Sequence, residues 1–262
     1  SLITHVSNNN YSMSFDGNDD YIEINSFTRN ANTDLTINIY AKGTGNMTCT
    51  KTPGYESYFE YQNDVNGNRI GFHLGILQTN SGNEWSVSNL GDLSTDYQFY
   101  SITIDDLGNG STLSEVFLNG VSLGQHTYPY SIPSYSFMEM GRNIVEQNAY
   151  YDGVIAEVQF WDGILTQQEI QNYMQCPPTG NESGLVGYWN FEEGSGNTVY
   201  DQTSNGNDGT INGSTFDTNV PLQSCQLTTN NGCDSVAILN LTINNSDTSY
   251  TNITACDSYD WD

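Results

Sequence analysis

The sequence predicts an all-β protein: a two-sheet antiparallel jelly-roll sandwich with one short helix. Short segments in which apolar and polar residues alternate recur along the chain, and turn residues separate them. This pattern is typical of strands with one buried face. The dipeptide Asn119-Gly120 accepts the positive φ angles of a tight hairpin turn. Antiparallel strands at such short spacing indicate a sandwich or a jelly roll.

The expected elements follow these segments in chain order. The strands span residues 12–15, 21–25, 35–41, 58–62, 70–77, 84–88, 97–105, 115–118, 136–140 and 154–161. One helix is expected after the last strand, because Thr166 and Glu169 have the spacing of a capping box and Pro177-Pro178 ends the pattern. The apolar residues on one side of this helix are Ile170, Tyr173 and Met174.

The charge of the chain restricts its partners. Acidic residues outnumber basic ones 31 to 5, which gives a formal net charge of −26. Nucleic-acid phosphates and anionic membrane surfaces require Lys and Arg patches, so neither is an expected partner. No apolar run of the sequence approaches the roughly 20 residues of a membrane span, and no basic-then-apolar signal peptide begins it. Divalent cations and neutral ligands are compatible with the charge, which alternatively serves only solubility.

The composition changes after Cys225. The triplet Cys-Asp-Ser occurs at 233 and again at 256, which indicates a small internal repeat. We therefore expect residues 1–222 to form the β sandwich. Residues 223–262 are expected to be a small β tail segment, the start of a cysteine-containing β repeat whose second copy is incomplete.

Four phrases of the chain resemble a known family. They are "FDGNDDYIEI" at 15–24, "LTINIYAKG" at 35–43, "EVFLNGVSLG" at 115–124 and "YDGVIAEVQFWDGILTQQEI" at 151–170. They resemble the laminin-G-like, concanavalin-A-type jelly rolls of bacterial surface proteins, with pentraxins as distant relatives, over residues 11–216. The Cys-Asp-Ser tail resembles tandem repeats of secreted proteins from Bacteroidetes-type bacteria. The resemblance implies a secreted or cell-surface location.

The order of two phrases is reversed relative to that family. "GLVGYWNFEEGSGNTVYDQTSNGNDGTI" at 184–211 resembles a phrase that normally precedes "FDG.DDY", yet here it follows. A second module would need its own "FDG.DDY" about 20 residues later, and "FDTNVPLQSC" at 216–225 stands there instead. We therefore predict a permuted strand order, in which residues 184–216 return to complete the sandwich; the termini of a sandwich lie close enough to permit this.

The five cysteines lie at 49, 176, 225, 233 and 256, without a C-x-x-C pair. This spacing argues against zinc and favours one or two disulfides in an oxidising compartment. Cys176 and Cys225 bracket the returning segment, so we predict a disulfide between them, although Cys233 competes for Cys225. Cys49 is predicted to be a thiol on a strand.

The turn after the first strand is the candidate metal site. Calcium takes six to eight oxygen ligands, and a glycine-containing turn can direct several inward. The resemblance implies a calcium ion near Asp16, Asp19 and Asp20, closed by an "I-D-E-V" phrase in which this chain has Ala156 in place of the Asp. The residues that would compensate are Asp152, Asn143 and Glu146. The alternative is a solvated hairpin turn. A second acidic loop at 201–208 is interpreted as an Asx-turn loop held by its own side chains.

Aromatic residues form the candidate ligand-binding surface. Flat rings pair with sugar faces while their polar edges form hydrogen bonds. The rings predicted to offer such a platform are Tyr55, Tyr58, Trp85, Tyr128 and Tyr130. The alternative is that most of them are packing residues, as Trp161 and Trp189 are expected to be.

The sequence contains no catalytic motif in the local context that its chemistry requires. The pattern G-x-S-x-G at 120–124 requires a strand-to-helix turn, whereas Ser122 lies in the return strand of a hairpin. The glutamates that a glycosidase would use have no companion at close alternate spacing: Glu56, Glu60, Glu139 and Glu157. The three histidines show no metal-ligand spacing.

The predicted function is therefore a non-catalytic adhesion or recognition module of a secreted or cell-surface protein, binding carbohydrate with calcium as a structural cofactor. Its expected partners are a glycan or a surface protein, and neighbouring modules of the same chain. The alternative is a structural spacer or assembly module of a long surface protein or filament. An exposed aromatic or metal-lined concavity would favour binding, and tyrosines buried on both sheets would favour a spacer.

Overall fold

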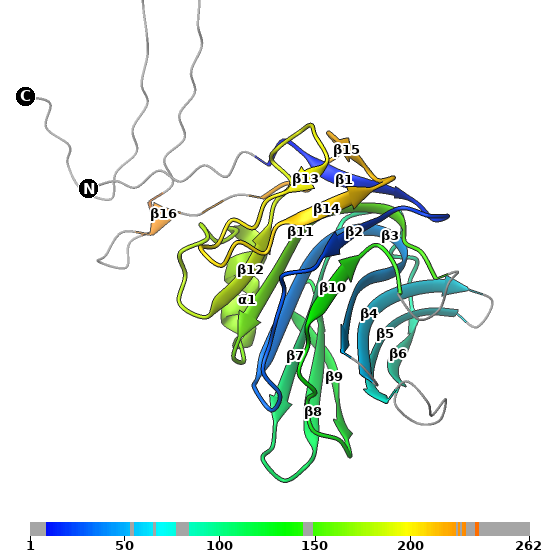
Figure 1. Cartoon of the computed structure of the whole chain (residues 1–262), viewed down its shortest axis with the longest axis vertical. Coiled ribbons are helices and arrows are strands. Elements are labelled where there is room, and N and C mark those ends of the chain that lie inside the picture. Colours follow the sequence, from blue (N-terminus) through cyan, green and yellow to red (C-terminus); the bar gives the residue numbers. More distant parts are fainter. Residues whose placement is uncertain are drawn as a thin grey trace, which may run out of the picture.

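Two antiparallel sheets stacked as a sandwich, with one helix outside them, make up the fold of the computed structural model (Figure 1). The structure describes residues 9–52, 55–64, 67–76, 84–143, 149–223, 225, 227–228 and 234–235. The elements are β1 (Ser12–Asp16), β2 (Tyr21–Ile24), β3 (Leu35–Thr52), β4 (Tyr55–Asp64), β5 (Gly67–Ile76), β6 (Glu84–Leu90), β7 (Gln98–Asp106), β8 (Thr112–Leu118), β9 (Val121–Tyr128), β10 (Phe137–Met140), β11 (Asp152–Asp162), α1 (Gln167–Gln175), β12 (Leu185–Trp189), β13 (Thr198–Val199), β14 (Gly209–Asn212), β15 (Thr215–Asp217), β16 (Leu227–Thr228) and β17 (Asp234–Ser235). The predicted all-β sandwich with one short helix is confirmed.

Strand β3 belongs to both sheets. Its first part, from Leu35 to Thr44, pairs with β11, and residues 35–41 also pair with β7. From Gly45 onward it pairs with β4, and residues 48–51 pair with β10. The expected strand ended at 41; in the structure the strand instead continues to Thr52, 18 residues in all, and crosses both layers.

Each sheet is completed around β3. One sheet contains β9, β8, β7, β3, β11 and β1, with β15 outside β1 and β12 also on β11. The other contains β13, β14, β2, β10, β3, β4, β5 and β6. All strand pairings among the described residues are antiparallel.

The returning segment lies in the same sandwich as the first strands. Strand β12 pairs with β11 at residues 158–161, and β1 pairs with the same edge of β11 at residues 152–155. Strand β14 pairs with β2, and β15 pairs with β1. In Figure 1 the yellow-to-orange strands β13, β14 and β15 accordingly lie beside the blue strands β1 and β2. The predicted permuted strand order is confirmed.

Strand β12 packs with both of its faces against other parts of the fold. Trp189 and Phe191 join the main core between the sheets, where Phe15 and Ile22 also lie. Leu185 and Tyr188 instead contact Trp161 in a separate cluster on the other face. The reason is that α1 covers this face, and Trp161, although buried, therefore packs under the helix rather than between the sheets.

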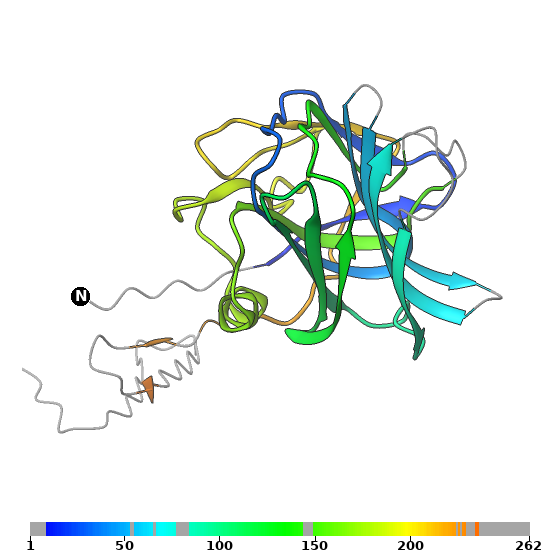
Figure 2. The same ribbon diagram turned by 90° about the horizontal axis from the view of Figure 1, so that it is seen from below.

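Helix α1 follows its predicted signals. The capping box of Thr166 and Glu169 is present. Ile170 packs with Phe99 and Phe117. The ring centroids of Tyr173 and Trp161 lie 4.4 Å apart. Figure 2 shows the helix end-on, outside the sheets. No helix among the described ranges is long and apolar enough to cross a membrane.

A disulfide joins Cys176, at the end of α1, to Cys225, 49 residues later. The predicted pairing is confirmed. Cys49 is buried on β3 and takes no part in this bond. Cys233 and Cys256 lie outside the described residues, as does most of the expected tail repeat, of which the structure describes only the antiparallel pair β16–β17.

Candidate functional site

The turn between β1 and β2 gathers three carboxyl groups. One carboxylate oxygen from each of Asp16, Asp19 and Asp20 lies within 4.8 Å of the others. Gly17 adopts a φ of +76°, a left-handed conformation that glycine accepts without strain. A local turn of five residues thus places the three predicted metal ligands together.

Asp16 holds this turn through its own side chain. Its Oδ1 accepts hydrogen bonds from the backbone N–H of Asn18 (2.9 Å) and Asp19 (3.4 Å), and its Oδ2 accepts from the Asn18 amide (3.2 Å). The hydrogen bonds from Asn18 lower the pKa of Asp16. Burial, followed by the neighbouring carboxylates of Asp16 and Asp19, raises the pKa of Asp20. The turn therefore concentrates negative charge that a cation would neutralise.

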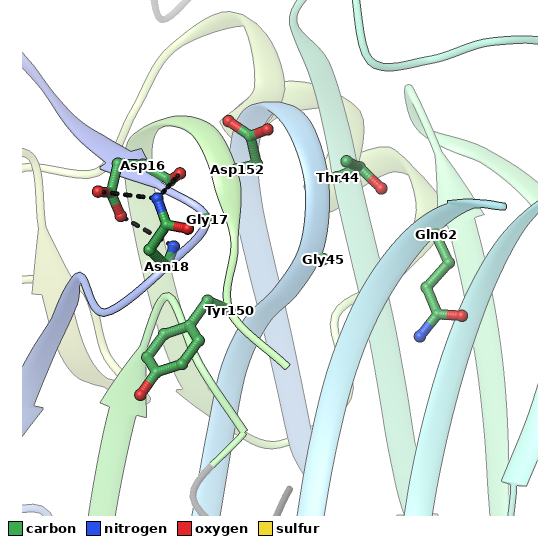
Figure 3. Close-up of a pocket in the computed structure, with 8 residues that line it drawn as sticks. All are labelled: Asp16, Gly17, Asn18, Thr44, Gly45, Gln62, Tyr150 and Asp152. Carbon is green, nitrogen blue, oxygen red and sulfur yellow. Dashed lines mark hydrogen bonds between the residues drawn. The ribbon is translucent and has the colours of Figure 1, made fainter. Parts of the chain in front are cut away.

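An open pocket of about 360 Å³ lies beside the turn. Figure 3 shows Asp16, Asn18 and Asp152 on one side of it, with Thr44 and Gln62 on the other. Its walls come from the β1–β2 turn, from β3, from β4 and from the start of β11. The lining residues are Asp16, Gly17, Asn18, Thr44, Gly45, Gln62, Tyr150 and Asp152.

Glycines allow the pocket walls to approach each other. A Cβ atom on Gly45 would lie 2.3 Å from the carbonyl oxygen of Tyr150, and one on Gly43 would lie 2.2 Å from the carbonyl oxygen of Asp152. Both distances are shorter than any real contact, so only glycine fits where β3 passes β11. The phrase "KGTGN" carried this signal, but sequence reasoning did not use it and did not place β3 or Tyr150 at the site.

Of the three residues expected to compensate for Ala156, only Asp152 lines the pocket among the described residues. Asn143 is 2% exposed, and its side-chain oxygen accepts from the Cys49 thiol at 3.8 Å. It does not line the pocket; the residue packs against β3 instead, so the structure does not bring it to the pocket with Asp152. Glu146 lies outside the described residues.

The predicted aromatic platform is not continuous. Tyr128 is fully buried, and its hydroxyl donates to the carbonyl oxygen of Phe72 at 2.8 Å. It cannot offer a ring face to a ligand, and its assignment as a binding residue is wrong. Tyr130 is half-buried against the core. The side chain of Tyr55 lies outside the described residues.

The remaining two predicted rings stack on histidines. Tyr58 lies parallel to the ring of His73, with centroids 4.8 Å apart. Trp85 lies parallel to the ring of His126 at 5.8 Å. Each ring thus has one face against a histidine. The ring at the pocket itself is Tyr150, which lies in none of the predicted strands.

The second acidic loop is a folded turn. Asp201 is 8% exposed, and its carboxylate accepts from four donors: the backbone N–H of Tyr188, Thr203 and Asn207, and the Thr203 hydroxyl. These bonds satisfy the side chain within the loop. The predicted Asx-turn loop is confirmed.

Ser122 lies on β9, the return strand of the β8–β9 hairpin, and its hydroxyl donates a hydrogen bond to Glu115. It is therefore not at the strand-to-helix turn that a nucleophile elbow needs.

Comparison with known families agrees with this architecture. The family described as the concanavalin A-like lectin/glucanases superfamily, of laminin-G type, matches residues 16–171. The chain belongs to this superfamily. The match ends before the segment 184–216 begins, although that segment completes the sandwich. Among curated protein sequences, no match is found.

Solved structures share the fold at low sequence identity. A putative carbohydrate binding protein from Bacteroides ovatus is 17% identical with a TM-score of 0.59, over 80% of this chain and 60% of that one. A SAP-like pentraxin from Limulus polyphemus is also 17% identical, with a TM-score of 0.49 over 66% and 85% of the two chains. Domains LG4-5 of the mouse laminin alpha1 chain are 10% identical, with a TM-score of 0.43 over 64% and 45%. These likenesses concern the fold.

Proposed function

We propose that this chain is a non-catalytic recognition module of an extracellular or cell-surface protein. It binds carbohydrate at the pocket beside the β1–β2 turn, with calcium held by Asp16, Asp19 and Asp20. Membership of a superfamily that includes lectins supports the proposal. So does the likeness of fold to a putative carbohydrate binding protein, although fold alone does not specify a ligand.

The pocket is the observation that carries the proposal. Carboxylates, amides, a hydroxyl and one tyrosine ring converge on one open hollow: Asp16, Asp152, Asn18, Gln62, Thr44 and Tyr150. A sugar presents hydroxyl groups to such side chains and a flat apolar face to a ring. An acid-lined concavity that could hold a metal ion supports binding over a spacer role, whereas the discontinuous aromatic platform gives no such support.

The residues present fit a calcium ion. The three carboxylates of the turn supply hard oxygen ligands within 4.8 Å of one another. Asp16 already accepts two hydrogen bonds at Oδ1 and one at Oδ2. Because each carboxylate oxygen carries two acceptor sites, Oδ2 can still bind a cation. Bound calcium would neutralise the turn and would supply a centre to which sugar hydroxyls coordinate.

The charge state of Asp16 does not support glycoside hydrolysis at this pocket. Such an enzyme requires one carboxylic acid that stays protonated beside a second carboxylate. Hydrogen bonds from Asn18 hold the pKa of Asp16 below its usual value, so this pocket carboxyl is ionised at neutral pH. That charge state suits cation binding and not proton donation.

A glycan-array screen with and without a chelator tests the function. We expect binding to one glycan class in calcium, with loss of binding in the chelator and in Asp152→Asn. The matched control is Asp96→Asn, because Asp96 is exposed and lies outside the pocket. Absence of binding in both conditions would favour the spacer, and binding that Asp152→Asn leaves unchanged would place the ligand elsewhere.

A further inference from the structure

A chain of buried polar side chains crosses the outer face of β11 beneath α1. The Asn38 amide on β3 donates to Gln159 Oε1 at 3.0 Å, and Gln159 Nε2 donates to Glu157 Oε1. Gln223, from the segment after β15, donates through its Nε2 to Glu157 Oε2 at 3.0 Å. Asn38 and Gln159 are 0% exposed and Glu157 is 2% exposed. Burying polar side chains costs free energy unless hydrogen bonds compensate for the lost water, as the bonds along this row do.

Trp161 fixes which atoms donate and which accept in this row of hydrogen bonds. Its indole N–H, which can only donate, bonds to Gln159 Oε1 at 3.0 Å. Gln159 Oε1 is therefore the acceptor, and its amide nitrogen faces Glu157. The carboxyl group of Glu157 thus accepts one amide N–H at each oxygen, from Gln159 and from Gln223.

No ion pair of the described residues involves Glu157. The titratable groups facing it are Tyr40 of β3 and Tyr188 of β12, whose pKa values are raised, first by burial. From α1, the Met174 carbonyl accepts from the same Gln223 amide at 3.4 Å. Burial without a cation raises the pKa of Glu157 to about 7, because it outweighs the amide hydrogen bonds from Gln223 and Gln159, which lower the pKa.

Gln223 ends a segment that we call the strap, residues 218–223. The strap is held at Asn219, whose carbonyl oxygen accepts from the Ser12 hydroxyl at 2.7 Å and from the Tyr97 hydroxyl. Its other end is held by Gln223, two residues before the disulfide at Cys225. Leu222 is 99% exposed, so apolar burial of that side chain does not hold this end. Figure 2 shows the orange segment after β15 passing beside α1.

We propose that Glu157 and Gln223 form a proton-controlled latch. The strap stays closed over β11 while Glu157 carries its proton, and it opens locally when Glu157 ionises. The proton leaves the carboxyl group for solvent. Opening exposes Glu157 to water and exposes the Cys176–Cys225 disulfide, whose two residues are already partly exposed.

Linkage gives the direction of the effect. In the open strap Glu157 is hydrated, so its pKa falls towards the ordinary value of 4.5, whereas in the closed strap it stays near 7. The closed form therefore binds the proton more tightly, and raising the pH through 7 favours opening. Between pH 5.5 and 8.5 the open population rises on the order of tenfold.

The rate at which a water-soluble phosphine reduces the disulfide of the full chain measures opening. The phosphine supplies two electrons to the S–S bond and takes oxygen from water, which leaves two thiols. Peptide mapping follows Cys176 and Cys225 at pH 5.5, 7 and 8.5. Each rate is divided by that of Glu157→Gln, which keeps the shape of the side chain but does not titrate, so the pH dependence of the phosphine cancels.

We expect the ratio of the reduction rate of the unaltered protein to that of Glu157→Gln to rise on the order of tenfold between pH 5.5 and 8.5. The matched control Glu115→Gln, on β8, should behave as the unaltered protein does. A ratio independent of pH would overturn the latch. Gln223→Ala should be reduced faster than the unaltered protein at pH 5.5, and an equal rate there would also overturn it. If Glu157→Gln does not fold, hydrogen exchange of the backbone amides of residues 219–223 in the unaltered protein replaces the ratio. After correction for the intrinsic pH dependence of exchange, protection of these amides should fall between pH 5.5 and 8.5, and unchanged protection would overturn the latch.

Discussion

Asp16 lies directly opposite Asp152 in the antiparallel pair of β1 and β11. Like charges directly opposite each other destabilise a strand pair, and both residues line the candidate pocket. Asp19 and Asp20 add further negative charge within the same turn. This concentration of negative charge opposes folding unless a cation or a ligand neutralises it.

Calcium should raise the melting temperature. A ligand at 100 times its dissociation constant stabilises by about 2.7 kcal/mol, which corresponds to a shift on the order of 5 °C for a domain of this size. Asp16→Ala should abolish the difference between calcium and chelator, as measured by differential scanning calorimetry. Identical melting of the unaltered protein in both conditions would leave only a solvated turn.

Gly45→Ala should destabilise the sandwich by about 2–4 kcal/mol, because its φ of +118° and the 2.3 Å approach to the Tyr150 carbonyl both exclude a side chain. Urea denaturation measures the change in the free energy of unfolding. Gly91→Ala is the control, since no atom lies within 4 Å of a Cβ there. Equal stability of the two variants would show that β3 can move away from β11.

A chain that ends at Cys176 should be insoluble or molten, whereas one that ends at Cys225 should unfold cooperatively. The shorter chain lacks β12, β14 and β15 and so exposes the edges of β11, β2 and β1. It also removes Trp189 and Phe191 from the core. Near-ultraviolet circular dichroism and urea titration compare the two. Native-like stability of the shorter chain would mean that residues from Gly184 onward form an independent unit.

The free energy of unfolding should decrease as pH rises from 5 to 8. The pKa of Glu157 is raised above its ordinary value of 4.5 to about 7, so its contribution is fully present below pH 4.5 and is lost as pH rises through 7. The loss is about 3 kcal/mol at most, given 1.36 kcal/mol per pKa unit. Urea titrations at several pH values measure it, and Glu157→Gln should flatten the profile. An equally steep profile in that variant would assign the effect to other groups.

Local signals in the sequence were sufficient for the elements and for one part of the site. The alternation of apolar residues predicts the strands, and Thr166 with Glu169 predicts the start of α1. Asn119-Gly120 adopts the positive φ angles, 51° and 71°, that its dipeptide favours. The three aspartates of the β1–β2 turn come together because five consecutive residues hold them. Each of these features depends on contacts within a few residues, which sequence spacing encodes.

Tertiary structure alone decided which distant residues share the site. Asp152 reaches the pocket because β11 pairs with β1, while Asn143 is turned towards Cys49. Tyr128 is buried because its hydroxyl meets the Phe72 carbonyl across the fold. Glu157 acquires its raised pKa from burial, which outweighs the opposing effect of the hydrogen bond from Gln223, 66 residues away. The sequence by itself determined the β1–β2 turn and its negative charge, because both depend on neighbouring residues. The packing of the two sheets determined which distant residues lie opposite that turn, because strand register and burial depend on the whole sandwich.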